Sequence, residues 1–129
     1  MVHLDRRDFV GASVLAVLVA AASSAEAAAD SSLYVIAELK AKAGKEAELR
    51  TAFNTLAEKS RANEPGCKNY TLLEVLSEPG HFYSFEIWVD RAALDGHMAS
   101  PHVKEALSKF GELLAMPPVQ IFLGAVSAG

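Results

Sequence analysis

Two apolar runs separated by a short turn signal constrain the fold of this chain most strongly. Residues 67–77 (CKNYTLLEVLS) and 81–90 (HFYSFEIWVD) are rich in β-branched and aromatic side chains, which favour strands. Between them stands Glu78-Pro79-Gly80, and proline and glycine are typical of turns. The pattern therefore predicts an antiparallel hairpin in the middle of the chain.

One strand and one helix are predicted before this hairpin. Residues 33–40 (LYVIAELK) begin with β-branched and aromatic side chains and end in charge, as expected of a strand. From residue 45 to 62, apolar side chains recur three and four positions apart with Lys, Glu and Arg between them, which indicates an amphipathic helix. Pro65 and Gly66 end this helix, because proline cannot continue its hydrogen-bond ladder.

Further helical segments and a last strand follow the hairpin. Residues 91–98 predict a short helical turn. Ser100 supplies an N-cap oxygen and Pro101 the fixed dihedral angle of a first helical residue, so a second long helix begins there and extends to Leu114. Residues 119–126 (VQIFLGAV) predict the last strand.

This order of elements predicts an α+β fold, namely a ferredoxin-like β-α-β-β-α-β domain with a four-stranded antiparallel sheet. Two helices cover only one face of such a sheet. The other face would expose a large apolar patch, which soluble monomers rarely tolerate. We therefore expect the chain to form a homodimer, sheet against sheet, that closes a dimeric α+β barrel.

The first 29 residues differ in composition from the rest of the chain. Arg6 and Arg7 are followed by an uncharged run rich in Ala, Val and Leu and then by small residues. This pattern predicts an export signal over residues 1–29, similar to the twin-arginine type. The apolar run is short compared with the roughly 20 strongly apolar residues of a membrane span. We expect this signal to be cleaved and to leave a domain of residues 30–129 that is periplasmic or extracellular, without stable membrane insertion after cleavage.

Charge and cysteine content exclude several classes of function. The chain has 16 acidic and 12 basic side chains and a formal charge of -4, with no basic stripe, so nucleic acid is not an expected partner. Cys67 is the only cysteine, which excludes an intramolecular disulfide and a thiolate metal cluster. We interpret Cys67 as a small buried hydrophobe at the start of a strand.

Polar side chains at every second position of the third predicted strand mark a candidate site. Strand alternation places Glu86, Trp88 and Asp90 on one face of the sheet. His97 and His102 follow directly, and we therefore expect this face to line a cavity. These two histidines are five positions apart across a proline, whereas a helical zinc pair is separated by four, so no metal site is expected.

The run from Glu86 to His102 resembles the antibiotic biosynthesis monooxygenase family, small dimeric α+β barrels that include quinol monooxygenases. The likeness rests on an E-x-W-x-D strand end followed by A-L-x-x-H-x-x-S-x-H, and on Pro65-Gly66-Cys67 before the second strand. It extends over residues 33–126. The resemblance implies oxygenation of a quinol or another small polyphenol by O2, with no metal or organic cofactor.

The resemblance also assigns roles to individual residues. His97 is the expected base, because an imidazole titrates near neutral pH. Glu86 is expected to orient that imidazole or to hold a substrate hydroxyl, and Trp88 to form the pocket wall and stack on a planar ring. His97 and Glu86 are thus the expected catalytic residues. The expected substrate-binding residues are Trp88, Tyr34, Tyr83 and His102, with Tyr70 as a third candidate tyrosine.

Structural roles remain open alternatives for the same residues. A ring at the position of His97 commonly donates to a backbone carbonyl, and Trp88 also suits a plain core position. His102 lies in a first helical turn, where the helix dipole disfavours a cation, which favours a neutral packing residue. Glu86 and Asp90 also suit ion pairs with Lys or Arg at the rim of the sheet, and Asp90 suits the cap of the helical turn that follows it. The alternative functions are a non-catalytic module that binds a small aromatic ligand or a protein partner, and a cofactor-free isomerase with the same base.

Overall fold

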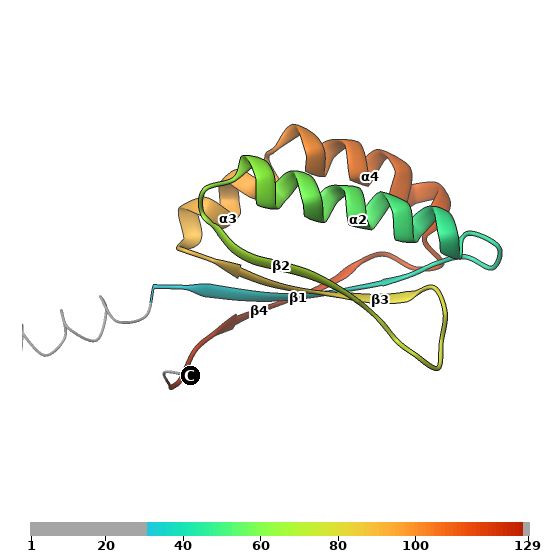
Figure 1. Cartoon of the computed structure of the whole chain (residues 1–129), viewed down its shortest axis with the longest axis horizontal. Helices are drawn as coiled ribbons and strands as arrows, with labels where there is room; N and C mark the ends of the chain where they lie inside the picture. Colours follow the sequence, from blue (N-terminus) through green and yellow to red (C-terminus); the bar gives the residue numbers. More distant parts are fainter. Residues whose placement is uncertain (1–30, 128–129) are drawn as a thin grey trace, which may run out of the picture. The chain divides into compact units, whose positions relative to one another are not determined.

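A four-stranded antiparallel sheet forms one layer of the domain in this computed structural model, which describes residues 31–127 (Figure 1). The strands are β1 Leu33–Lys40, β2 Cys67–Glu74, β3 His81–Trp88 and β4 Val119–Gly124. Their order in the sheet is β2-β3-β1-β4, and β2 and β3 form the predicted hairpin. All four predicted strands are confirmed, and the last three end two or three residues earlier than expected.

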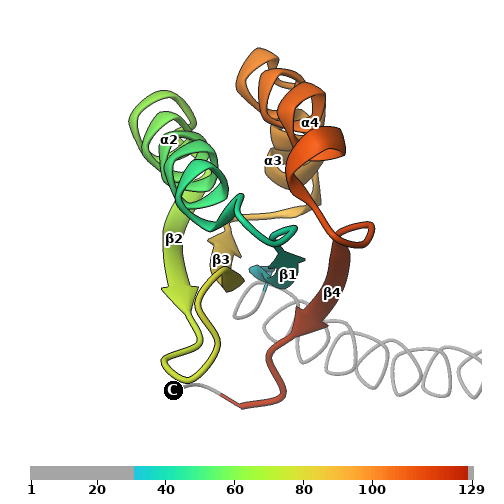
Figure 2. The ribbon, with the colours of Figure 1, turned by 90° about the vertical axis from the view of Figure 1, so that its right-hand side faces the viewer.

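Three helices lie on one face of this sheet (Figures 1 and 2). They are α2 Glu46–Asn63, α3 Arg91–Met98 and α4 Pro101–Leu113. The two long helices α2 and α4 lie side by side, and the short α3 connects β3 to α4. The predicted ferredoxin-like fold is confirmed, and α3 coincides with the expected helical turn.

Strand alternation separates the two faces of the sheet. On β1, Val35 and Leu39 are buried under the helices, and the register pairs them with Glu86 and Phe82 of β3. These side chains therefore share the covered face. The helices complete this core with buried side chains, among them Leu49, Phe53, Leu56, Val103, Ala106 and Phe110.

Two side-chain caps fix the junction between α3 and α4. Oδ1 of Asp90 accepts a hydrogen bond at 2.8 Å from the backbone N–H of Ala93, which confirms the expected cap of α3. Oγ of Ser100 caps α4 and also donates to the carbonyl of His97 at 2.6 Å. Ser100 therefore ties the end of α3 to the start of α4. The resulting bend places the rings of His97 and His102 with their centroids 6.0 Å apart.

Gly66 allows α3 to pack closely on the chain between α2 and β2. A Cβ atom at this position would lie 2.5 Å from Cβ of Ala93, much closer than non-bonded carbon atoms approach. The carbonyl of Gly66 also accepts a hydrogen bond at 2.9 Å from the N–H of Val89, just after β3. The missing side chain thus sets the distance between α3 and the segment that carries Glu64.

The second face of the sheet, here called the open face, is covered by none of the described helices (Figure 2). Ile121 of β4 is 49 % exposed and Phe85 of β3 is 36 % exposed. The exposed apolar side chains of the open face are Leu73, Phe85, Val119, Ile121 and Leu123. The expected apolar patch is therefore present, and the homodimer that would cover it stays a prediction.

The predicted export signal, residues 1–29, lies outside the described residues. Within residues 31–127, none of the helices combines the length and the apolar character needed to cross a membrane.

Candidate active site

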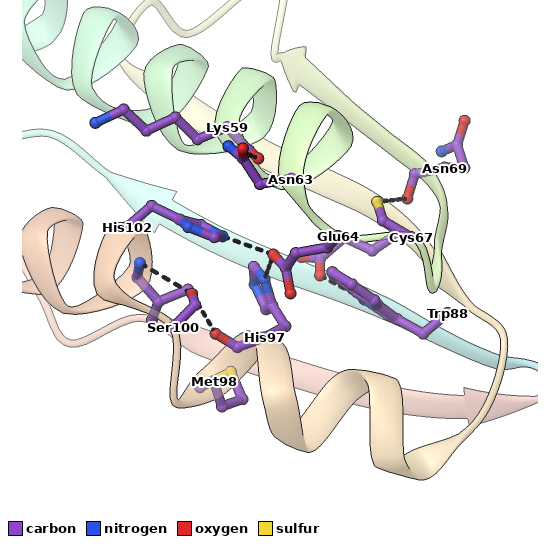
Figure 3. Close-up of polar contacts among 12 residues, drawn as sticks. Lys59, Asn63, Glu64, Cys67, Asn69, Trp88, His97, Met98, Ser100 and His102 are labelled. Carbon is purple, nitrogen blue, oxygen red and sulfur yellow. Dashed lines mark hydrogen bonds and ion pairs between the residues drawn. The ribbon is translucent and has the colours of Figure 1, made fainter.

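Glu64 joins two histidines at the end of the helical layer (Figure 3). Its Oε2 atom lies 2.8 Å from Nδ1 of His97 and 2.6 Å from Nε2 of His102. With Glu64 as a carboxylate that only accepts hydrogen bonds, a proton is assigned to each of these two ring nitrogens. The three side chains therefore form one hydrogen-bonded group that connects three helix ends.

The local sequence explains why the three side chains converge. Glu64 follows the last residue of α2 and has extended backbone angles, φ -117° and ψ 100°. Such angles are expected before Pro65, because the proline ring disfavours helical angles at the preceding residue. The carboxylate is therefore held just beyond α2. His97 lies in the last turn of α3 and His102 in the first turn of α4.

His97 packs against the indole of Trp88. The two ring centroids are 4.4 Å apart with an interplanar angle of 37°. Trp88 is fully buried, and only 3 % of the surface of His97 is exposed. The ring of Tyr70 lies 5.8 Å from that of His97 and 6.5 Å from that of Trp88. The imidazole is thus fixed by a carboxylate at Nδ1 and by aromatic rings around it.

Glu86 is a second buried carboxylate of this site. Its Oε1 accepts a hydrogen bond at 3.0 Å from Nε1 of Trp88, and its Oε2 accepts one at 2.6 Å from Oγ of Ser84. Burial raises the pKa of Glu86, against the effect of these two hydrogen bonds. The three residues alternate along β3, so the strand itself brings both donors to the carboxylate.

A cavity of about 190 Å³ lies between the helices and the sheet. Four polar side chains reach it, namely Tyr70, Glu86, His97 and Gln120. The rest of its wall is apolar and comes from Ala37, Leu39, Phe53, Leu56, Met98, Val103, Ala106, Leu107, Phe110 and Pro118. An apolar cavity of about 150 Å³ holds benzene, so this one has room for a single aromatic ring.

The structure places His97 and Glu86, the two predicted catalytic residues, at this cavity and places Trp88 behind them. His97 and Glu86 both line the cavity, whereas the fully buried indole does not. Because Trp88 lies against His97 and donates to Glu86, it supports these two side chains. The indole does not line this cavity, and the expected stacking of Trp88 on a ligand ring stays a prediction.

The carboxylate that contacts the imidazole of His97 is that of Glu64 and not that of Glu86. Nδ1 of His97 bonds Glu64, and both oxygens of Glu86 are engaged by Trp88 and Ser84. His102 also does not line this cavity, and its predicted substrate contact stays a prediction. It bonds Glu64 from the other side.

Two of the predicted substrate-binding tyrosines, Tyr34 and Tyr83, lie on the open face of the sheet, away from this cavity. Tyr34 precedes the buried Val35, and Tyr83 alternates with the buried Ser84, so both side chains are on the open face. The hydroxyl of Tyr83 donates to Glu38 at 2.9 Å. Tyr70, the third candidate, is the tyrosine that lines the cavity. Burial raises the pKa of Tyr70 well above its ordinary value, so its phenol stays protonated.

The sequence patterns did not indicate Glu64 as a site residue, and the spacing of His97 and His102 was interpreted as unsuited to a metal site. Glu64 lies in the segment 63–66, which was interpreted only as the end of the first predicted helix. The four-residue spacing of a zinc pair applies within one helix, whereas His97 ends α3 and His102 begins the next helix. The ligand atoms of Glu64, His97 and His102 all lie within 4.8 Å of one another.

Cys67 lies next to this group but does not act as a thiolate. It is partly buried, and its Sγ lies 3.6 Å from the carbonyl of Asn69. Burial, with smaller contributions from Glu64 and Glu86, raises the pKa of its thiol to about 11. The thiol therefore remains protonated at neutral pH, as expected of a packing residue.

The buried His97–Glu64 pair beside a largely apolar cavity is the candidate small-molecule site of this ferredoxin-like domain. Comparison with known families gives a more specific result. The family model described as antibiotic biosynthesis monooxygenase matches residues 32–109, and the chain belongs to this family.

Individual relatives support this assignment. The chain is 39 % identical over 89 residues to the uncharacterized protein sll1783 of Synechocystis, a match that covers 69 % of this chain and 60 % of that protein. It is 35 % identical over 83 residues to the protein named Putative monooxygenase Rv0793 of Mycobacterium tuberculosis, covering 64 % of this chain and 80 % of the relative. The chain thus spans less than two thirds of the Synechocystis protein.

Solved structures show the same fold. The structure of Rv0793 superposes with a TM-score of 0.71 at 31 % identity, over 76 % of this chain and 98 % of that one. The structure of PA3566 from Pseudomonas aeruginosa superposes with a TM-score of 0.70 at 28 % identity, over 75 % of this chain and 96 % of that one.

Proposed function

We propose that this protein is a monooxygenase that oxidises a quinol or another small polyphenol with O2, without a metal or organic cofactor, and that His97 is its base. The main support is the environment of the two ring nitrogens of His97. Nδ1 of His97 is held by Glu64, while the ring lines the cavity and Nε2 has no hydrogen-bond partner among the described residues. Nε2 is therefore the ring nitrogen available to a ligand.

Glu64 selects the reactive form of His97. Because the carboxylate accepts a hydrogen bond from Nδ1–H, the neutral ring keeps its lone pair on Nε2. When Nε2 takes a proton, the carboxylate 2.8 Å from Nδ1 stabilises the resulting imidazolium. Glu64 is thus a positioning residue and His97 the base.

The cavity supplies the environment that the reaction needs. Its largely apolar wall limits the contact of a radical pair with water. Glu86 lies in the same wall, and its carboxylate retains lone pairs beyond the bonds from Trp88 and Ser84, so it can accept from a second substrate hydroxyl. A substrate with two hydroxyl groups on one ring therefore suits the site.

The proposed reaction balances without another reactant. Nε2 of His97 takes the proton of a hydroxyl, and the phenolate passes one electron to O2. The phenoxyl radical and superoxide combine at a ring carbon to form a C–O bond, and the peroxide takes the proton from His97. Loss of the ring C–H proton then forms a carbonyl as the O–O bond breaks, and the leaving hydroxide becomes water. A quinol and O2 thus give a hydroxyquinone and water.

Oxygen uptake by the purified protein with a panel of hydroquinones tests this function. We expect one atom of ¹⁸O₂ in the product and one in water. His97→Gln should fold and lose turnover by about 10²–10⁴-fold, the usual contribution of a general base. His81→Gln, which changes a histidine on the open face, is the matched control and should retain turnover. Uptake that is equal in wild type and His97→Gln would exclude His97 as the base.

Two results would identify the alternative functions. Turnover of a lactone or dienol under anaerobic conditions would indicate an isomerase that uses His97 as a proton shuttle. A rise in melting temperature with a small aromatic ligand, without oxygen uptake, would indicate a non-catalytic binding module.

The homodimer and the export of the chain are further parts of the proposal. The apolar open face supports association of two copies. Arg6, Arg7 and the apolar run that follows them support export to the periplasm or beyond through a twin-arginine-like signal. Fractionation of cells that express the wild-type chain or Arg6→Lys/Arg7→Lys tests export, and equal distribution of both in the cytoplasm would contradict it.

A further inference from the structure

The group formed by Glu64, His97 and His102 has the composition of a metal site. Two imidazoles and one carboxylate are the protein ligands of several catalytic zinc and iron centres, which leave further positions to water or substrate. Here the three ligand atoms come from three separate helix ends and lie within 4.8 Å of one another. All three side chains are largely buried, with exposed fractions of 14 %, 4 % and 11 % for Glu64, His97 and His102.

The separations between the ligand atoms are close to those that a metal ion requires. Tetrahedral zinc with bonds of about 2.0–2.1 Å holds its ligand atoms roughly 3.3 Å apart. The two N···O separations are now 2.8 Å for His97 and 2.6 Å for His102, the lengths of hydrogen bonds. Opening each by roughly half an ångström makes room for an ion, and Oε1 of Glu64 has no hydrogen bond among the described residues.

An ion has its own route to this group. A surface hollow of about 560 Å³ is lined by Glu64, Trp88 and His102, together with Asn63 and Pro101. The 190 Å³ cavity on the other side of His97 is lined by neither Glu64 nor His102. His97 therefore separates a hollow that reaches the carboxylate from a cavity suited to the substrate.

We propose that Glu64, His97 and His102 bind one divalent transition-metal ion of the zinc type, and that the bound ion inhibits the base. Nitrogen and carboxylate ligands favour Zn²⁺ over Mg²⁺ or Ca²⁺. An ion on Nδ1 of His97 displaces the proton of that nitrogen, so the neutral ring carries its proton on Nε2. Nε2 then has no lone pair with which to take a proton from a hydroxyl in the cavity.

Binding of the ion and inhibition of His97 are supported by different observations. Metal binding rests on the geometry of the three ligands alone. Inhibition rests on the proposed function, because it requires that Nε2 of His97 act as the base. A binding measurement without substrate therefore tests the site even if the protein has no oxygenase activity.

Titration of the chelator-treated protein with Zn²⁺ by calorimetry tests binding. We expect one ion per chain, no comparable heat with Mg²⁺, and a Co²⁺ derivative with visible absorption typical of low coordination. His102→Gln and Glu64→Gln should each weaken Zn²⁺ binding by more than the about 10–100-fold that loss of a supporting residue costs. Both changes preserve side-chain size, and circular dichroism shows whether each variant is folded.

The control is His81→Gln, because His81 also lies against two carboxylates, those of Glu38 and Glu78. We expect this variant to bind Zn²⁺ as the wild type does. Loss of binding in His81→Gln with retention in His102→Gln would place the ion on the open face and overturn the proposal, as would the absence of any stoichiometric binding.

Oxygen uptake with added Zn²⁺ tests the inhibitory half. One equivalent of Zn²⁺ should suppress turnover by the wild type and leave turnover by His102→Gln largely unchanged, because that variant keeps the Glu64–His97 pair but lacks the third ligand. Full turnover by a wild-type protein shown by calorimetry to carry the ion would overturn inhibition. An inactive protein that still binds Zn²⁺ would contradict the proposed function and leave the metal site confirmed.

Discussion

Glu64 and His97 are 33 positions apart in the chain, and Oε2 of the first lies 2.8 Å from Nδ1 of the second. The contact joins the end of α2 to the end of α3, and it decides which nitrogen of the buried imidazole faces the cavity. The reactivity proposed for His97 thus depends on a residue from a distant part of the chain.

Replacement of Glu64 should lower turnover more than it changes substrate binding. In Glu64→Ala the ring of His97 loses the acceptor that fixes its tautomer, and we expect kcat to fall by roughly 10–100-fold, less than the about 10²–10⁴-fold loss of the base itself. KM should change little, because Glu64 does not line the cavity. Glu64→Gln keeps an amide oxygen as acceptor and should retain more activity. Unchanged kcat in Glu64→Ala would contradict the positioning role.

Local sequence patterns were sufficient to predict the fold. The strands and helices follow from apolar periodicity, and the caps at Asp90 and Ser100 follow from residue type, because these features depend on neighbours a few positions away. The alternation of side chains along a strand was also sufficient to predict that Tyr83 and Glu86 lie on opposite faces of the sheet, because they are three positions apart on one strand. The face on which Tyr34 lies could not be predicted from the sequence, because β1 has apolar side chains on both faces.

The central residue of the site could not be predicted in the same way. Glu64 meets its partners across 33 and 38 positions, and those contacts depend on the angle between α3 and α4. The same bend makes the sequence spacing of His97 and His102 uninformative, because a rule for one continuous helix does not describe two helices that meet at Ser100. Pro65 was the available signal, since it forces Glu64 out of α2.

Gly66→Ala should disturb the site through backbone packing alone. The new Cβ would lie 2.5 Å from Cβ of Ala93, so α3 and the loop that carries Glu64 must move apart. We expect a loss of about 1–3 kcal/mol in the free energy of unfolding, the usual cost of overpacking, measured by urea denaturation. Adding Ala93→Gly removes the clash and should recover part of that loss, although glycine in a helix costs about 1 kcal/mol. A single variant as stable as the wild type would show that α3 is not packed as closely as described.

Ionisation of the buried carboxyl of Glu86 should lower the free energy of unfolding as the pH rises. Its pKa is raised by burial above the usual 4.5, so from pH 4.5 upward the unfolded chain loses this proton before the folded protein does. The free energy of unfolding therefore decreases until the pH passes the pKa of Glu86 in the folded protein. Above that pH the decrease stays constant. Glu86→Gln carries no such proton, and its amide can keep both bonds, accepting from Trp88 and donating to Ser84.

The contribution of Glu86 is measured as the difference in free energy of unfolding between the wild type and Glu86→Gln at each pH. Other carboxyls act in the opposite direction: Arg50 and the backbone N–H of Gly80 lower the pKa of Glu74 to about 2. These groups are present in both the wild type and Glu86→Gln, so their contributions cancel. Urea denaturation from pH 4 to pH 8 should show Glu86→Gln gaining stability relative to the wild type as the pH rises. A constant difference over this range would contradict the raised pKa.

The open face supports a prediction about assembly. Its polar groups satisfy one another, since Nε2 of His81 lies 2.6 Å from Glu38 and the hydroxyl of Tyr83 donates to the same carboxylate. Lys40 pairs with Glu78 at 3.3 Å at the end of this face. Covering these groups therefore leaves few unpaired donors or acceptors, while covering the apolar side chains around Ile121 removes them from water.

A single charge on this face should therefore dissociate the dimer. Ile121→Lys places an ammonium group among Phe85, Ile36 and Leu123, where a second copy would have to bury it without a partner. Met116→Lys is the matched control, because Met116 is 44 % exposed in the connection between α4 and β4. Sedimentation equilibrium should give a dimer for the wild type and Met116→Lys and a monomer for Ile121→Lys. Because the cavity is formed within one chain, a wild-type monomer would contradict the assembly while leaving the proposed site intact.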